Sequence, residues 1–384
     1  MPPRVINPDE IEAQGTSGIV DGLDTGEVMG GLYTDADGDQ ITNDGSHILG
    51  NGGDDTVYAG YGDDTIDGGE GADVLFAGEG NDSVAGGIGD DSVWGDQGQD
   101  TLWGNEGDDK LIGGAGDDLI TGGAGDDVLV GDLNPGDRGG MDPSDPAEPG
   151  FGNDTLVLDA GNDEAYGGSG DDEFRIFDGF GNHTIVGGET GETEGDTLNA
   201  GALSDDVSVI YTGDESGTIT DGSGTANFTE IERLDLGSGD DRVEILTSTS
   251  GTVNGSDGFD TLVLPDPLPG ETPPNVTITN TIDNGDGTFT YSGYVDFDDG
   301  SRMDFENFEE IICFTPGTLI DTLRGKVAVE TLVPGDKVLT RDHGYQSLAW
   351  VGRRDLTAAE LATCPAAGTG ADCGGIAGGE PARA

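Results

Sequence analysis

The sequence predicts an all-β fold, a solenoid in which short strands stack as parallel coils. A nine-residue period runs without insertion from Gly50 to Val130. Within each period, a glycine-rich stretch of six residues favours a turn, and the remaining three favour a short strand whose middle, aliphatic side chain points inward. Strict internal repetition of this kind is typical of folds that grow by stacking one unit on the next.

The repeated unit has the form small-x-x-Gly-x-Asp-x-aliphatic-x, as in residues 68–76 (GGEGADVLF). Three positions keep one residue class through nine consecutive units: glycine at the fourth, aspartate at the sixth and an aliphatic residue at the eighth. The aspartates are Asp55, Asp64, Asp73, Asp82, Asp91, Asp100, Asp109, Asp118 and Asp127. Because their phase never slips, an accident of composition is excluded.

Stacking would place these aspartates in two columns. Two units make one coil, turn–strand–turn–strand, so alternate turns lie on the same side. One column would hold Asp55, Asp73, Asp91, Asp109 and Asp127, and the other Asp64, Asp82, Asp100 and Asp118. Neighbours in a column would lie roughly 4.8 Å apart, where two carboxylates repel by about 3 kcal/mol at an effective dielectric of about 20. A hard cation between the turns would reverse the sign of this interaction.

Calcium is the cation that suits these turns. It takes about 6–8 oxygen ligands, and glycine-rich turns expose backbone carbonyls beside each carboxylate. Magnesium prefers a tight octahedron with retained water, and zinc prefers histidine or cysteine ligands. The period returns after residue 151, so Asp163 and Asp172 join the expected calcium ligands. The alternative is an acidic, glycine-rich solenoid or linker that binds no metal specifically.

The unit resembles the hemolysin-type (RTX) calcium-binding nonapeptide. The resemblance implies a right-handed parallel β-roll that folds on extracellular calcium. It also implies export from a Gram-negative bacterium through a type I channel, guided by an uncleaved C-terminal signal. We therefore expect a secreted, extracellular calcium-binding protein of the surface, matrix or adhesion type.

Charge narrows the range of partners. The chain carries 79 acidic and 14 basic residues, a formal net charge of −65. This excludes nucleic acid and argues against anionic membranes as partners, since both attract cationic surfaces. High net charge with few aromatics ordinarily indicates disorder, but the strict period favours a folded chain whose charge is neutralised. The first residues hold no apolar stretch suited to a cleaved signal, and no run approaches a transmembrane segment.

The charge is uneven along the chain, which indicates a domain boundary near Cys313. Residues 313–384 hold 7 basic and 8 acidic residues and all 3 cysteines, whereas residues 1–312 hold 7 basic and 71 acidic residues. The expected parts are an acidic lead-in (1–49), the nine repeats (50–130), a Pro/Gly loop insert (131–151), irregular coils (152–202), β-meanders with further repeats (203–312), a small β fragment (313–354) and a low-complexity tail (355–384).

Two positions outside the regular repeats each carry two interpretations. Residues 35–41 (DADGDQI) resemble the opening of a calcium loop, but their sixth position is Gln40 rather than glycine; the alternative is an acidic turn. His183 occupies the position of the aspartate, where we expect a turn residue and, as the alternative, a metal ligand.

The ninth position of the repeat predicts two unlike outer faces. Along one face it reads Tyr58, Phe76, Trp94, Ile112 and Val130; along the other it reads Asp67, Ala85, Trp103 and Thr121. The first set forms an apolar stripe. We expect either residues 200–312 or another molecule, such as a cell-surface or matrix partner, to cover it.

Residues 203–312 predict two β-meanders that dock back on a coil. The first set of strands is 207–211, 217–220 and 225–228, and the second is 276–279, 289–291 and 294–297. Both sets end alike, as residues 228–234 (FTEIERL) and residues 305–311 (FENFEEI). The repeat resumes after the first set, at Asp241 and Asp260.

Residues 313–354 resemble the first half of a Hint (hedgehog/intein) domain, through CFTPGT at 313–318 and VPGDKVLT at 333–340. The resemblance implies that the Cys313 thiolate attacks the Ile312 carbonyl, and that the resulting thioester is cleaved. A Thr-x-x-His assists in that family, and Thr340 to His343 has this form, although a turn is the alternative. No matching second half follows Arg354, which favours an inactive remnant over self-cleavage.

Overall fold

The computed structural model describes residues 19–132 and 152–312, apart from residues 24, 32, 37–38, 189–190, 266–273 and 286–287, together with four strands between residues 319 and 347. Every regular element in these residues is a strand. No helix of the described part is long and apolar enough to cross a membrane. The chain divides into two compact units. Unit 1 is Met1–Leu203 with Gly222–Arg233, and unit 2 is Ser204–Asp221 with Leu234–Ala384.

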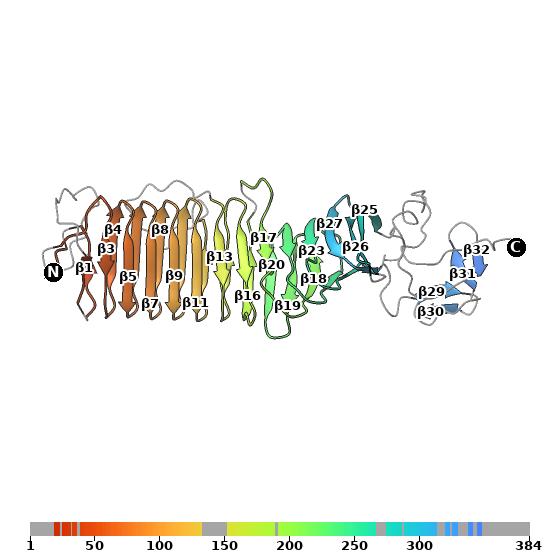
Figure 1. Cartoon of the computed structure of the whole chain (residues 1–384), viewed down its shortest axis with the longest axis horizontal. Helices are drawn as coiled ribbons and strands as arrows, with labels where there is room; N and C mark the ends of the chain where they lie inside the picture. The colour runs from red at the N-terminus through yellow and green to blue at the C-terminus, as the bar shows by residue number, and fades with distance from the viewer. Residues whose placement is uncertain are drawn as a thin grey trace. The chain divides into compact units, whose positions relative to one another are not determined.

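Unit 1 consists of two parallel sheets whose strands alternate along the chain (Figure 1). The strands of one sheet, in order across it, are β1 (Ile19–Asp21), β3 (His47–Leu49), β5 (Thr65–Glu70), β7 (Ser83–Ile88), β9 (Thr101–Glu106), β11 (Leu119–Ala124), β13 (Thr155–Leu158), β15 (Glu173–Ile176) and β17 (Thr197–Asn199). Those of the other are β2 (Val28–Met29), β4 (Thr56–Tyr61), β6 (Val74–Glu79), β8 (Ser92–Gln97), β10 (Lys110–Ala115), β12 (Val128–Val130), β14 (Glu164–Tyr166), β16 (Asn182–Val186) and β20 (Thr225–Thr229).

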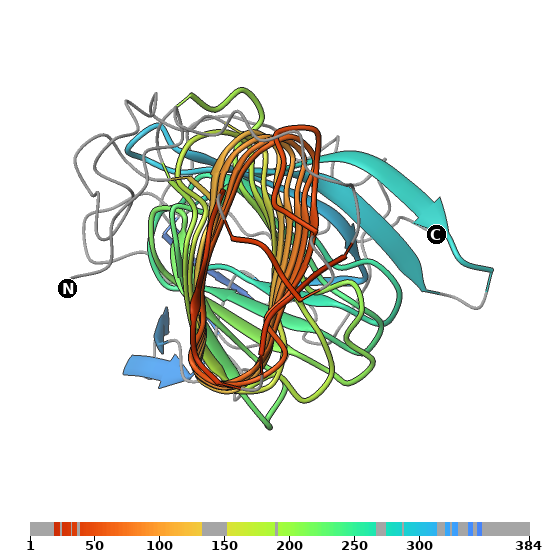
Figure 2. The same ribbon diagram turned by 90° about the vertical axis from the view of Figure 1, so that its left-hand side faces the viewer.

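The register confirms a coil made of two repeats. In the pairing of β6 with β8, Leu75 lies opposite Val93 and Phe76 opposite Trp94. Every second repeat is therefore stacked in phase, and the coils of the regular repeats superimpose as one flattened ring when viewed along the stack (Figure 2). The chain is an all-β roll, as the sequence predicts.

The strands are longer than the three residues that the repeat suggests. β4 to β11 each span six residues, because pairing continues into the first three positions of the next repeat. In β6 and β8, for example, Gly78 lies opposite Asp96 and Glu79 opposite Gln97. Glycine does not interrupt the pairing here, since its backbone amide and carbonyl still meet those of the next coil.

The interior of each coil is narrow. The aliphatic side chain at the eighth position is buried throughout, from Val57 to Leu129, with at most 1% exposure. The glycine at the fourth position adopts a left-handed backbone, as at Gly89 (φ +137°), where a Cβ would run into the Gly71 carbonyl oxygen of the preceding coil. A side chain at this position would therefore prevent the coils from approaching to strand distance.

The apolar stripe at the ninth position forms on one outer face. Tyr58 stacks on Phe76 at 4.9 Å between ring centroids, and Phe76 on Trp94 at 4.6 Å. Tyr58 is 38% exposed, whereas Trp94 and Ile112 are 7% and 2% exposed. The stripe is therefore partly covered within this single chain, and its open part is the Tyr58–Phe76 end.

Unit 2 combines short parallel ladders with antiparallel hairpins. Its strands are β18 (Ser208–Gly213), β19 (Ser216–Thr220), β21 (Arg233–Asp235, at the boundary with unit 1), β22 (Arg242–Ile245), β23 (Gly251–Asn254), β24 (Thr261–Val263), β25 (Asn275–Asp283), β26 (Phe289–Asp296), β27 (Arg302–Phe308) and β28 (Glu310–Ile312). β18 pairs antiparallel with β19 and parallel with β22, and the parallel ladder continues through β24 to β28.

The second meander forms with a different division into strands. The two short strands predicted at 289–291 and 294–297 are one strand, β26, with a register shift between Tyr291 and Gly293. That interpretation was wrong because Ser292 and Gly293 signal a bulge here rather than a turn. The third strand is β27, which pairs antiparallel with β26 and parallel with β23, so the meander does dock back on a coil.

Beyond residue 312 the described elements are β29 (Leu319–Thr322), β30 (Gly325–Ala328), β31 (Lys337–Thr340) and β32 (Gly344–Ser347), in the order β30-β29-β31-β32. All three of their pairings are antiparallel. Cys313, His343 and the expected tail at 355–384 lie outside the described residues.

Candidate metal centre

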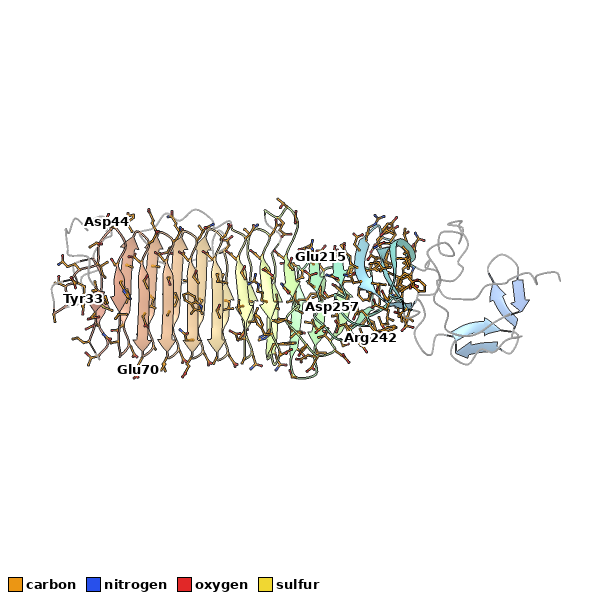
Figure 3. All side chains as sticks on the ribbon, viewed as in Figure 1. Tyr33, Asp44, Glu70, Glu215, Arg242 and Asp257 are labelled. Carbon is orange, nitrogen blue, oxygen red and sulfur yellow. The ribbon has the colours of Figure 1, made fainter. Side chains whose placement is uncertain are left out.

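The aspartates at the sixth position point into the coil and form two hydrogen-bonded ladders. The ladders follow the two opposite edges of unit 1 at which the chain turns between the sheets, and Asp44 and Glu70 mark these edges in Figure 3. Each aspartate donates its backbone N–H to Oδ1 of the aspartate one coil later. Ladder A runs Asp55, Asp73, Asp91, Asp109, Asp127, Asp163. Ladder B runs Asp64, Asp82, Asp100, Asp118, Asp154, Asp172, Asp196. The structure thus brings together the predicted columns.

The second carboxylate oxygen of these side chains is the unusual feature. From Asp55 to Asp127, Oδ2 of every sixth-position aspartate is buried and accepts no hydrogen bond among the described residues. The side chains themselves are only 1–3% exposed. A buried carboxylate oxygen without a partner is costly, because it loses its hydration without replacement. A cation bound to these oxygens would offset that cost.

Backbone carbonyls converge on the same places. A Cβ on Gly95, the first residue of its repeat, would meet both Asp100 Oδ2 and Gly113 O of the next coil. The same pairing recurs at Gly104, with Asp109 Oδ2 and Gly122 O. Because each glycine lacks a side chain, a carboxylate oxygen and a carbonyl oxygen share one space between successive coils. Such an all-oxygen set fits a hard divalent cation of the calcium class.

Burial also changes the ionisation of the ladder. Desolvation, with a smaller contribution from neighbouring aspartates, raises the pKa of Asp64 to about 7, that of Asp91 to about 7 and that of Asp100 to about 8. The hydrogen bonds from the backbone N–H groups oppose the shift. Burial therefore disfavours the ionised carboxylates in a coil that holds no cation.

The comparisons with known proteins agree with this geometry. Residues 42–75, 49–84, 67–102, 76–111, 103–134 and 149–175 match the family model of the RTX calcium-binding nonapeptide repeat. The chain carries RTX repeats. Residues 312–368 match the family model of the Hint domain, a match that continues past Arg354. No curated protein matches the chain.

The RTX turns also carry a different kind of ladder, which was not predicted from the sequence. It uses the fifth position, on the exposed side, and runs in the opposite direction: Asp108 N–H donates to Asp90 Oδ1, and Asp126 N–H to Asp108 Oδ1. The available signal was the fifth residue itself, which is Asp, Asn or Gln in eight of the nine regular repeats, Ala72 being the exception. Where both ladders are present, as between the coils of Asp90 and Asp108, the gap between coils is bridged in both directions.

Five buried aspartates were also missing from the expected ligand set. Asp154, Asp196, Asp241 and Asp260 each have an unpartnered Oδ2 among the described residues, and Asp132 has two such oxygens. The sequence marks Asp154, Asp241 and Asp260 through Gly-x-Asp, but Asp196 lacks the preceding glycine and Asp132 stands at the second position of its turn. Burial raises the pKa of Asp132 to about 8, with Asp172 contributing.

Each ladder ends on a residue that replaces aspartate as the acceptor. Ladder A ends at His183, whose Nδ1 lies 3.2 Å from the Asp163 backbone nitrogen. Burial lowers the His183 pKa to about 4, so the ring is neutral and Nδ1 accepts this hydrogen bond. The expectation of a turn residue was wrong, since His183 is fully buried in β16. Ladder B ends at Glu232, whose Oε2 accepts Asp196 N–H at 2.6 Å.

Unit 2 holds a short ladder of the same kind. Val207 N–H donates to Asp241 Oδ1, Asp241 N–H to Asp260 Oδ1, and Asp260 N–H to Glu309 Oε2 at 2.8 Å. Glu232 and Glu309 are the glutamates of the two similar endings in the sequence, residues 228–234 and 305–311. Their shared motif is therefore a ladder cap.

The acidic lead-in forms a hairpin around Asp35. Thr34 and Gln40 make an antiparallel bridge, and Asp39 N–H donates to Asp35 Oδ1 at 2.9 Å. One carboxylate oxygen of Asp35 is thus used inside the turn.

Proposed function

We propose that this chain is a secreted protein of the surface, matrix or adhesion type, whose RTX β-roll folds when it binds extracellular calcium. The supporting observation is the row of buried Oδ2 atoms along ladders A and B, which, apart from that of Asp163, have no hydrogen-bond partner among the described residues. Without cations, the ladders hold carboxylates stacked coil on coil, and their repulsion opposes folding. With calcium between the coils, the same oxygens become ligands, and metal binding and folding are one equilibrium.

The ligand set proposed is the sixth-position carboxylates together with the first-position carbonyls. It comprises Asp55, Asp64, Asp73, Asp82, Asp91, Asp100, Asp109, Asp118, Asp127, Asp163 and Asp172, and we add Asp154, which belongs to ladder B and has the same unpartnered Oδ2 among the described residues. Asp163 differs from the others, because its Oδ2 lies 3.2 Å from His183 Nδ1. Export through a type I channel accords with folding that waits for calcium outside the cell.

The test is the far-ultraviolet circular dichroism of chelated protein on addition of calcium. We expect β-sheet signal to appear at millimolar calcium and to vanish again when a chelator is added. Magnesium at the same concentration should leave the spectrum of the chelated chain unchanged. If the chelated protein already has its full β signal, and calcium changes nothing, the proposal fails.

A partner on the outside of the roll would contact the open end of the apolar stripe. Tyr58 is the exposed ring there, and it continues the stack of Phe76 and Trp94. An exposed aromatic surface on an otherwise acidic protein suits a partner that offers an apolar or cationic face. If the Tyr58→Ser variant is no longer retained on the cell surface while its calcium-dependent folding is unchanged, the result supports this assignment. Retention equal to that of the wild type would contradict it.

The second candidate function is self-processing at the Ile312–Cys313 bond. The Hint match begins at residue 312, and the Ile312 carbonyl oxygen accepts Leu264 N–H at 2.8 Å at the end of β28. In this reaction the Cys313 thiolate adds to the Ile312 carbonyl carbon. That addition forms the C–S bond; the C–N bond then breaks, and the released amine takes up the proton that the Cys313 thiol lost. A nucleophile afterwards cleaves the thioester. His343 would assist this acyl shift.

Incubation with hydroxylamine or dithiothreitol tests this candidate. An active domain releases a fragment ending at Ile312, and the Cys313→Ala variant does not. If the wild-type chain stays intact under both nucleophiles, the self-processing function is excluded and the calcium-binding function is unaffected.

A further inference from the structure

The last aspartate of ladder B sits in a turn that departs from the RTX pattern. Glu194 stands where the fourth-position glycine would be, yet Asp196 keeps its ladder place, since Oδ1 accepts Asp172 N–H at 2.7 Å. Asp171 holds the turn in shape: its Oδ1 accepts the backbone N–H groups of Thr193, Glu194 and Gly195. Glu192 is therefore presented beside Asp196 by a fixed loop.

A separate segment of unit 1 closes the other side. β20 pairs in parallel with β16, and the chain then turns at Glu230, which has a left-handed backbone (φ +58°). A Cβ on Gly187 would meet both Asp196 Oδ2 and the Glu230 carbonyl oxygen. Two residues later, Glu232 Oε2 accepts Asp196 N–H. Such a backbone conformation is unfavourable for glutamate, and here it places the Glu230 carbonyl oxygen and the Glu232 carboxylate beside Asp196.

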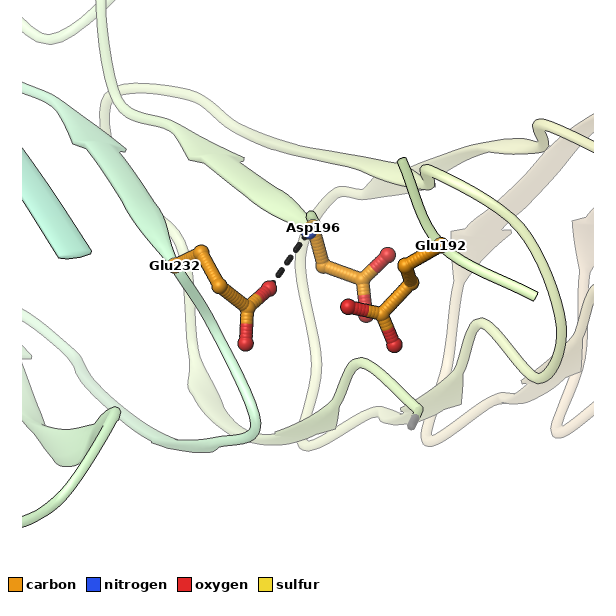
Figure 4. A group of neighbouring side chains, drawn as sticks. All are labelled: Glu192, Asp196 and Glu232. Carbon is orange, nitrogen blue, oxygen red and sulfur yellow. Dashed lines mark hydrogen bonds between the residues drawn. The ribbon is translucent and has the colours of Figure 1, made fainter. Parts of the chain in front are cut away.

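Three carboxylates meet at this point (Figure 4). One oxygen each from Glu192, Asp196 and Glu232 lie within 4.8 Å of one another. Asp196 is fully buried, and its Oδ2 accepts no hydrogen bond among the described residues. An acidic cluster on the surface would be hydrated, but here a buried, unpartnered carboxylate oxygen points into the cluster. Like charges at this distance repel strongly in a poorly solvated place, unless a cation lies between them.

We propose that Glu192, Asp196 and Glu232, with the Glu230 carbonyl oxygen, form a separate calcium site that ties the Gly222–Arg233 segment to the last coil of unit 1. The ligands are all oxygens, which favours calcium over zinc, and they come from flexible carboxylates and a carbonyl, which favours calcium over magnesium. The site differs from the sites between RTX turns in its two glutamates and in joining segments far apart in the chain. The inference extends the proposed calcium-dependent folding to one further site.

The cap of unit 2 provides a natural control. There, Asn307 has the same left-handed backbone (φ +58°), and its carbonyl oxygen lies with Asp260 Oδ2 beside Gly255. Glu309 accepts Asp260 N–H in the same way, but its other oxygen accepts the Thr290 hydroxyl at 2.6 Å. Among the described residues, a hydroxyl thus contacts the glutamate of this cap, whereas in unit 1 the carboxylate of Glu192 lies beside Glu232. The site in unit 2 thus has two carboxylates and a neutral donor, a much weaker cation ligand set.

Hydrogen exchange of the full chain during a calcium titration tests the site, because peptides report each segment separately. Calcium should protect residues 222–233 of the wild-type chain. In Glu192→Gln this protection should require about tenfold more calcium, while residues 92–130 keep their own midpoint. Thr290→Val, the matched change at the other cap, should leave the protection midpoint of residues 222–233 unchanged.

The outcomes separate the two proposals. If residues 222–233 gain protection at the same calcium concentration in Glu192→Gln as in the wild type, the further site is refuted while the calcium roll stands. If residues 92–130 gain no protection from calcium in the wild type, the proposed function fails. If, in that case, calcium still protects residues 222–233 of the wild type but not those of Glu192→Gln, the further site is supported without the calcium roll.

Discussion

Unit 1 and unit 2 contain the same kind of coil but differ in what fills its interior. Unit 1 stacks two long ladders of buried aspartates around one aliphatic side chain per strand, so its interior is thin and acidic. Unit 2 has a two-aspartate ladder, Asp241 and Asp260, beside the meander of β25 to β27, whose Met303, Phe305 and Phe308 are fully buried. Apolar burial stabilises unit 2 without any ion. Unit 1 depends on what neutralises its ladders.

The ladder caps at Glu232 and Glu309 differ between the units in a similar way, at a single neighbouring residue. Glu232 and Glu309 both accept the N–H of the last aspartate, and both follow a left-handed residue two positions earlier. They differ in the neighbour, a carboxylate at one cap and a hydroxyl at the other. The motif therefore terminates a ladder, and the neighbour decides whether the end binds a cation.

The largest expected difference between the units is their pH dependence without calcium. In the folded ladders burial raises the aspartate pKa values, to about 7 at Asp118 and about 8 at Asp100, above the unfolded value near 3.8. The folded state then binds more protons than the unfolded chain between these limits, so its stability is greatest below about pH 4 and falls as pH rises towards about 8. In chelator, lowering the pH from 8 to 5 should restore coil structure to unit 1.

Unit 2 serves as the internal control for this titration, since among the carboxyls of its described residues only those of Asp241 and Asp260 have raised pKa values, of about 6 and about 7. Hydrogen exchange at each pH measures both units in one sample. Equal stabilisation of the two units on acidification, or none in unit 1, would contradict the account.

The next effect is steric. Gly89→Ala should destabilise unit 1 by about 3 kcal/mol or more, because a Cβ at this positive φ runs into the Gly71 carbonyl oxygen. Gly300→Ala in unit 2 has the same left-handed strain (φ +97°) but open space around the Cβ, and should cost about 1–2 kcal/mol. Urea unfolding in saturating calcium measures both. Similar losses for the two variants would show that coil contact is not what requires Gly89.

A cap deletion should have an intermediate effect. Glu309→Ala leaves the buried Asp260 N–H without its acceptor and should destabilise unit 2 by about 1–3 kcal/mol. Glu309→Gln retains an oxygen in the same place and should be close to the wild type. The unfolding midpoint of unit 2 in urea distinguishes them, and an equal loss in both variants would mean that the charge, rather than the hydrogen bond, makes the cap.

The smallest expected effect is the loss of one ladder charge. Asp100→Asn keeps an Oδ1 that accepts Asp82 N–H but removes a negative ligand, so the calcium midpoint for folding of unit 1 should rise about tenfold, equivalent to about 1.4 kcal/mol. Asp260→Asn should leave that midpoint unchanged, because it belongs to the other unit's ladder. A calcium titration followed by circular dichroism provides the measurement.

The sequence predicted what its period controls, namely the two-repeat coil, the aspartate columns and the inward eighth position. The six-residue strands were not predictable from propensity, since Gly78 and Gly114 pair through backbone atoms alone. The ladder ends were missed for a related reason. His183 and Glu232 each depart from aspartate in identity, and only three-dimensional register shows that they occupy its place. Asp196 was hidden by the change at Glu194.

The central claim is that cations close the aspartate ladders of unit 1, and the exchange rates of the ladder amides test it most directly. The N–H groups of Asp73, Asp82, Asp91 and Asp100 each depend on the carboxylate of the next coil. In chelator at pH 7.5 we expect these amides to exchange freely, and in millimolar calcium to be protected, with β26 of unit 2 protected in both conditions. Protection of the ladder amides without calcium would contradict the account.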